Sequence, residues 1–250
     1  MDHLLLATLA VLVLIGGFIG SMMSGGSIIV FAVLTFLEVP VKTAIGTLKF
    51  AITILGLFSA VTFFKGGAVN LELTPSLALT SLLGSVVGAQ LIVSLTDQVV
   101  NALVLLLICL GVVMSLRSKR PEEPERGGPV GSRRVLSVFS GFLLGLYIGM
   151  LGIASALVAI SILMFLFRLD ILRANGTAKV IIFANNFVAC VTYALNGQVD
   201  FFLGALLSFP IAVGSWAGAK TALKLESSKL RFVFVGMALL TMAKLISEIV

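Results

Sequence analysis

Residues 4–37 read LLLATLAVLVLIGGFIGSMMSGGSIIVFAVLTFL, a continuous apolar run without one charged side chain. As a single straight helix this run would be about 50 Å long, whereas the hydrocarbon core of a bilayer is about 30 Å thick. Small, flexible residues lie near its middle, at Ser24, Gly25, Gly26 and Ser27. We therefore expect the run to break there, either as a hairpin of two short helices or as two tilted short spans.

The second half of the chain contains a matching run. Residues 135–167 are uncharged throughout and carry Ala154, Ser155 and Ala156 near their middle, where we expect a second break. A polar linker, residues 117–134, separates the two halves. The other apolar segments are residues 41–64, 73–96, 98–116, 174–199, 201–219 and 228–250.

Composition indicates that lipid is the solvent of this protein. Hydrophobic residues make up 59% of the chain and charged residues 11%, with a mean hydropathy of +1.19, whereas a soluble domain carries about 25% charged residues. Long continuous apolar runs favour helices over barrel strands, which would alternate in short segments. The sequence therefore predicts an all-α membrane protein.

Several classes of function find no support in the residue types. The net charge of +6 comes from basic residues in short loops, so we expect no nucleic-acid binding. His3 is the single histidine, which leaves a zinc site or a catalytic triad without its parts. We therefore expect that the protein binds no cofactor and no metal ion, and that it is not an enzyme.

The two halves are related by duplication. When 130 is added to each number from Ala44 to Ala89, 15 of 46 positions are identical without a gap, and they include Gly, Thr and Lys in register. Upstream of this stretch the offset is 129. We therefore divide the chain into a first repeat, residues 1–116, the linker, residues 117–134, and a second repeat, residues 135–250.

The distribution of basic residues predicts that the repeats are inverted. If each half crosses the membrane an odd number of times, thirteen basic loop residues, including the six in the linker, share one side and two lie opposite. An even number gives no bias. The positive-inside rule then makes the linker cytoplasmic. Each half would consist of a broken or re-entrant helix pair followed by three transmembrane helices, as in inverted-repeat transporters.

Two lysines are the candidates for substrate contact. Lys49 and Lys179 are the only charges well inside spans, and they occupy equivalent repeat positions. A charge at membrane depth costs free energy and usually marks function, although these side chains could also extend to the interface. The two breaks are further candidates through Ser24, Gly25, Gly26, Ser27 and Ser155. A broken helix presents free N–H groups that bind anions; the alternative is close helix packing.

Polar residues beside the lysines complete the candidate list. Hydroxyl and amide groups there suit oxyanion contacts or interhelical hydrogen bonds: Gly46, Thr47, Asn175, Gly176, Thr177, Asn185 and Asn186. No Asp or Glu lies deep in a span, so a carboxylate proton relay is poorly supported.

The duplicated Ala-x-Gly-Thr-x-Lys, the glycine-rich break after Gly20 and the Asn-Gly-Gln-Val-Asp200 turn resemble the sulfite exporter TauE/SafE family over about residues 10–245. The resemblance implies a bacterial inner-membrane transporter that exports small anions such as sulfite or sulfoacetate, with Ser24, Gly25 and Gly26 on the family's glycine-rich motif. The second half departs from that motif, because Ala154, Ser155 and Ala156 replace glycines. An anion channel and, less favoured, an intramembrane enzyme remain as alternatives, and the expected partners are the small anion, the lipid bilayer and, for assembly, a second copy in a homodimer.

Overall fold

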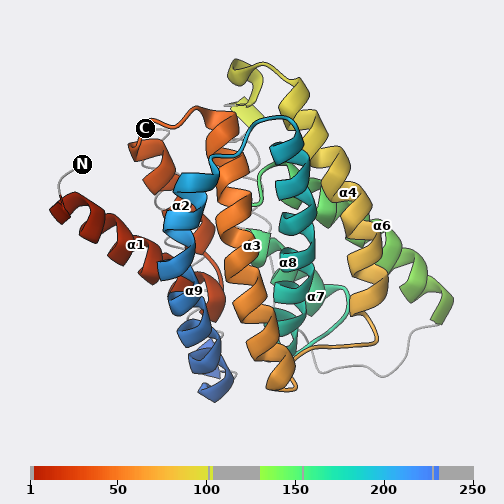
Figure 1. Cartoon of the computed structure of the whole chain (residues 1–250). Coiled ribbons are helices and arrows are strands. Elements are labelled where there is room, and N and C mark those ends of the chain that lie inside the picture. Colours follow the sequence, from red (N-terminus) through yellow and green to blue (C-terminus); the bar gives the residue numbers. More distant parts are fainter. Residues whose placement is uncertain (1–2, 101, 104–129, 154, 227, 231–250) are drawn as a thin grey trace.

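The computed structural model describes residues 3–100, 102–103, 130–153, 155–226 and 228–230. This part of the chain is helical and contains no strand, so the predicted all-α class is confirmed (Figure 1). The helices are α1 His3–Met22, α2 Gly26–Phe36, α3 Val41–Lys65, α4 Thr74–Ser94, α6 Val130–Met150, α7 Ser155–Phe165, α8 Ile171–Leu195 and α9 Phe201–Lys224.

Four of these helices are long and apolar enough to cross a bilayer, namely α3, α4, α8 and α9, with 21 to 25 residues each. In contrast, α2 and α7 have 11 residues each, which at helical rise is about 16 Å and half of a hydrocarbon core. The protein is therefore a multi-pass membrane protein with short helices between its long ones. The predicted segments 98–116 and 228–250 lie almost wholly outside the described residues.

Both long apolar runs are interrupted. The first run stops at Met22 and resumes at Gly26, and Gly25 turns the chain with a φ of 99°. The second run stops at Met150 and resumes at Ser155, so this interruption begins earlier than the sequence predicted. Its turn contains Gly152 with a φ of 68°, a conformation that favours glycine. A glycine is thus present in the second break, upstream of Ala154, Ser155 and Ala156, where we expected the break.

Helix α6 begins at Val130, inside the predicted linker of residues 117–134. Residues 117–129 lie outside the described part of the chain.

The centre of the bundle is the pair α3 and α8, which run side by side in opposite directions (Figure 1). Glycines mark the register of this pair: Gly46 faces Tyr193, Gly56 faces Phe183, and Gly176 faces Phe63. At Gly56 an added Cβ would lie 2.9 Å from the Phe183 Cα, so the two backbones approach as closely as glycine permits. Each pair of numbers has the same sum, as expected of an antiparallel pair without slippage.

The outer helices exchange partners between the halves. Helix α1 packs on α9, and α6 packs on α4. Gly214 and Gly218 of α9 lie against the α1 main chain at Leu14 and Phe18. The glycines of α4 at positions 84 and 88 make the equivalent contact with α6. These four glycines therefore serve close helix packing.

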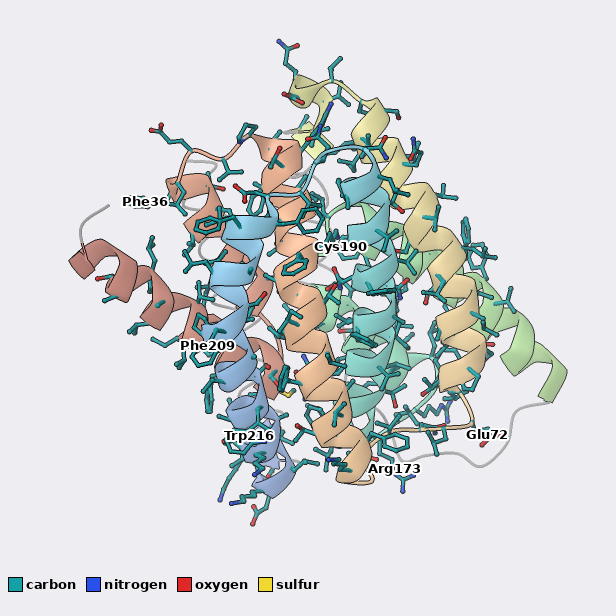
Figure 2. The ribbon with its side chains drawn as sticks, in the orientation of Figure 1. Phe36, Glu72, Arg173, Cys190, Phe209 and Trp216 are labelled. Carbon is teal, nitrogen blue, oxygen red and sulfur yellow. The ribbon has the colours of Figure 1, made fainter. Side chains whose placement is uncertain are left out.

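The surface and the ends of the bundle fit a membrane setting. Large apolar side chains such as Phe209, which is 78% exposed, cover the outside of the helices. Helices α3 and α9 end, and α8 begins, at one end of the molecule, and these termini carry Lys65, Lys224 and Arg173 (Figure 1). Figure 2 shows Arg173 and Trp216 toward that end and Phe36 toward the other.

Candidate functional site

The Lys179 side chain, from α8 in the second half, contacts the C-terminal end of α1 in the first half. This side chain is fully buried, and its Nζ donates hydrogen bonds to the carbonyl oxygens of Gly20, at 2.5 Å, and Met23, at 3.0 Å. These carbonyls belong to the C-terminal end of α1, where the last turn of a helix leaves oxygens unpaired and the helix dipole is negative. The ammonium group of α8 thus caps α1.

Lys49 makes the equivalent contact in the opposite direction. Its buried Nζ donates to the carbonyl oxygen of Ile148 in the last turn of α6 and lies beside Gly152 of the second break. Gly20 stands two positions before the end of α1, and Ile148 two positions before the end of α6. Each lysine therefore binds the same carbonyl position of the opposite half. The sequence offset of 129 holds only after the break, because the second interruption is one residue longer than the first.

Each break has a second cap, and here the halves differ. The Asn175 Nδ2 donates to the carbonyl oxygen of Met22 at 2.8 Å. The Tyr193 hydroxyl donates to the carbonyl oxygen of Met150 at 2.9 Å. Met22 and Met150 are the last residues of α1 and α6, so an amide and a phenol carry out the same task. Tyr147 adds a third contact, because its hydroxyl donates to the Ile153 carbonyl oxygen at 2.5 Å.

Sequence reasoning missed both tyrosines. The chain has two Tyr in total, and both hydroxyls bind carbonyls at the second break. Their counterparts in the first half are Phe63, for Tyr193, and Ile19, for Tyr147, and neither has a hydroxyl. A tyrosine hydroxyl at a position where the other repeat has an apolar residue was therefore the sequence signal that could have indicated these contacts.

The short helices begin where the long ones end. Helix α2 starts with Gly26 and Ser27, and α7 starts with Ser155; all three residues are buried. Ser24 precedes α2, its side chain is 1% exposed, and its Oγ has no hydrogen-bond partner among the described residues. The N-terminal end of a helix is positive and attracts anions. Each break thus places the capped negative end of one helix next to the positive end of the following helix.

Asn185 and Asn186 lie close to the crossing of α3 and α8. The Asn185 Nδ2 donates to the Ser81 Oγ and the Ile181 carbonyl oxygen, both at 2.8 Å, and within the described part of the chain its Oδ1 has no partner. The Asn186 Oδ1 faces Gly152, at 3.6 Å from where a Cβ of that glycine would lie. The structure therefore brings Asn186 to the second break, where the Lys49 Nζ also lies.

The Gly-Thr pairs contact turns of the opposite half. The Thr47 Oγ1 accepts the main-chain N–H of Asp200 at 3.0 Å, and the Thr177 Oγ1 accepts that of Asn70 at 2.9 Å. The glycines before them, at positions 46 and 176, face carbonyl oxygens of the same turns. These hydroxyls tie α3 and α8 to the turns of the opposite half.

The two capped breaks are separated in depth. In the α3–α8 register Lys179 is level with Ala60 of α3. Ala60 lies roughly three helical turns beyond Lys49, which is about 16 Å. Among the described residues no carboxylate pairs with either lysine, and no group of His, Cys, Asp and Glu is placed to hold a metal ion. The polar interior is therefore built from ammonium, amide, hydroxyl and main-chain groups.

Known proteins that resemble the chain are named as probable membrane transporters. A probable membrane transporter protein of Haemophilus influenzae is 24% identical over 249 residues, covering 98% of this chain and 95% of the relative. The probable membrane transporter protein YjnA of Bacillus subtilis is 24% identical over 254 residues, covering 94% and 98%. A third, ORF9 of a Sinorhizobium species, is 26% identical over 224 residues, covering 88% and 84%. No solved structure matches the chain significantly.

The model of the family described as sulfite exporter TauE/SafE matches residues 9–245, which is nearly the whole chain. The relatives carry transporter names and no enzyme name. Together with the long apolar helices and the two capped breaks, this match shows that the chain is a membrane transporter that belongs to the TauE/SafE family.

Proposed function

We propose that this transporter moves small anions, of the class of sulfite and organosulfonates such as sulfoacetate, outward across the bacterial inner membrane. The anion binds at the N-terminal ends of α2 and α7, against Ser24, Ser27 and Ser155. The lysines lie directly behind this site as caps of α1 and α6.

One observation carries the anionic specificity. At each break a buried ammonium occupies the negative helix end, and the positive end of the next short helix follows directly after the break. The lysine offsets the charge of the carbonyls that would repel an anion, so the serine-bearing end presents a net positive field. Ser24 adds a buried hydroxyl that has no partner in the described part of the chain and can donate to an oxyanion.

Outward movement follows from the membrane potential. An inside-negative potential favours exit of an anion by about 2.3 kcal/mol per charge for every 100 mV. Net export therefore needs no coupling ion. This fits the interior, where the described residues offer lysines and no buried carboxylate.

We further propose that the two halves are inverted repeats, residues 1–116 and 135–250, and that the linker is cytoplasmic. Support comes from the opposite directions of α3 and α8 and from contacts that recur at equivalent positions (Figure 1). The predicted excess of basic residues on one side gives the orientation.

Transport by the purified protein in proteoliposomes tests the function. We expect sulfite and sulfoacetate to exchange, and small cations of similar size not to. Ser24→Ala should raise the half-saturating anion concentration several-fold without lowering thermal stability, because the Oγ has no partner to lose among the described residues. Ser94→Ala, on the exposed side of α4, is the matched control.

Three outcomes would contradict this account. If Ser24→Ala binds the anion with wild-type affinity, the first break is not part of the anion site. Unitary currents would assign the protein to the channels instead of the carriers. Transport of cations alone would overturn the anionic class.

A further inference from the structure

A groove lies on the outer surface between α3 and α9, away from both breaks. Its volume is about 740 Å³, within the range of roughly 300–1,000 Å³ that is typical of ligand sites. The wall is mainly apolar, and its lining includes Leu57, Phe58, Val61, Trp216 and Leu223. The side chain of Leu223 packs on Gly66, which follows α3, so the ends of the two helices meet at one end of the groove.

Two lysines stand at that same end. Lys65 is the last residue of α3, and Lys220 lies one turn before the end of α9. Both line the groove and both are exposed. The Lys220 Nζ lies 4.0 Å above the centre of the Trp216 ring, a cation–π contact that holds it over the groove. Among the described residues, neither lysine forms an ion pair with a carboxylate.

The two lysines are not repeated at the equivalent positions of the duplication. At the offset of 130, the counterpart of Lys65 is Leu195 and the counterpart of Lys220 is Gln90. A second pocket, lined by Phe50, Phe187, Cys190, Leu195 and Phe201 among others, has no lysine or arginine in its lining. Duplication alone therefore does not account for the paired lysines.

We propose that this groove binds an anionic phospholipid of the bilayer, with an acyl chain along the apolar wall and the headgroup phosphate between Lys65 and Lys220. The apolar wall of the groove matches the acyl chain of such a lipid, and the two lysines at one end match its negatively charged headgroup. Cytoplasmic leaflets are rich in anionic lipids, and basic pockets between transmembrane helices on that side bind their headgroups. A tryptophan at the level of the headgroup is typical of the membrane interface.

Native mass spectrometry of the full-length protein, released from micelles with added lipid, tests the proposal. We expect one dioleoylphosphatidylglycerol adduct to be retained and dioleoylphosphatidylcholine to be lost. The double variant Lys65→Gln, Lys220→Gln should lower the apparent affinity for phosphatidylglycerol by about 30-fold, as expected for two lysines at a phosphate. The double variant Lys224→Gln, Lys229→Gln removes equal charge outside the groove and should retain the adduct.

Retention of both lipids alike, or equal loss in the two double variants, would overturn the proposal, because the charge effect would then be general. Displacement of the adduct by millimolar inorganic phosphate would show a site for free phosphate instead of a lipid. Size-exclusion profiles of all variants establish that they are folded, and the measurement does not depend on transport.

Discussion

At the scale of single residues, the interior is governed by lysines that bind main-chain oxygens. An ammonium buried in a membrane protein is costly unless its protons are accepted. Lys179 meets this need with two carbonyls at the end of α1, and Lys49 with a carbonyl of α6. Each lysine therefore stabilises the fold by joining the two halves, which the sequence alone did not predict.

Lys179→Met and Lys49→Met should each lower both stability and transport. The carbonyls that lose a charged donor have no water to replace it, and a hydrogen bond to a charged group contributes about 1.5–3 kcal/mol. Arginine should not restore either property, since its planar fork cannot take the place of a compact ammonium. Thermal unfolding in detergent measures the first effect and proteoliposome flux the second. Wild-type melting and flux in both variants would show that the caps are dispensable.

At the scale of elements, the fold depends on helices that approach across glycine. Helices α3 and α8 meet at Gly56, and α1 and α9 meet at Gly214 and Gly218. These contacts bring α8 to the α1 break and α3 to the α6 break, so the caps depend on the spacing of the helix pair. A change at the crossing should therefore act on both breaks.

Gly56→Ala should destabilise the protein by about 1–3 kcal/mol, the usual effect of overpacking. The new Cβ would meet the Phe183 backbone at 2.9 Å, and backbone cannot move aside as a flexible side chain can. The control is Leu79→Ala, at a position on α4 that is 66% exposed and faces outward. Urea or thermal titration in detergent compares the two. A smaller effect at Gly56 than at Leu79 would contradict the tight crossing.

Particular elements show how far the sequence could predict this structure. The first break was predictable because the uncharged run over residues 4–37 is too long for one span and contains adjacent glycines. The second was displaced because Gly152 lies upstream of the small residues on which the prediction rested. The depth of the lysines was predictable from the absence of other charges. Their partners were not, because main-chain carbonyls have no signature in sequence and belong to the opposite half.

At the scale of the whole molecule, the two halves interlock. Thr47 holds the turn at Asp200, and Thr177 holds the turn at Asn70. Each lysine caps the other half, and each outer helix packs across the bundle, α1 on α9 and α6 on α4. The described helices therefore form one bundle with contacts between the halves throughout, although the sequence divides into two repeats.

The orientation of this unit gives a prediction that labelling can check. On a background that lacks Cys109 and Cys190, Glu125→Cys and Glu226→Cys should react with a membrane-impermeant maleimide only after the cytoplasmic side is opened. Gln98→Cys, shortly after the end of α4, should react in intact cells. Labelling of positions 125 and 226 from opposite faces would contradict the positive-inside assignment.

The exchanged caps also bear on how the chain is made. The carbonyl of Gly20 is bound by a lysine that lies 159 residues further along the chain. At about 5–20 residues per second, that lysine emerges from the ribosome roughly 8–30 s later. During this interval the end of α1 lacks the ammonium group that binds its Gly20 and Met23 carbonyl oxygens. We therefore expect the first half to reach its final packing only after α8 has been inserted.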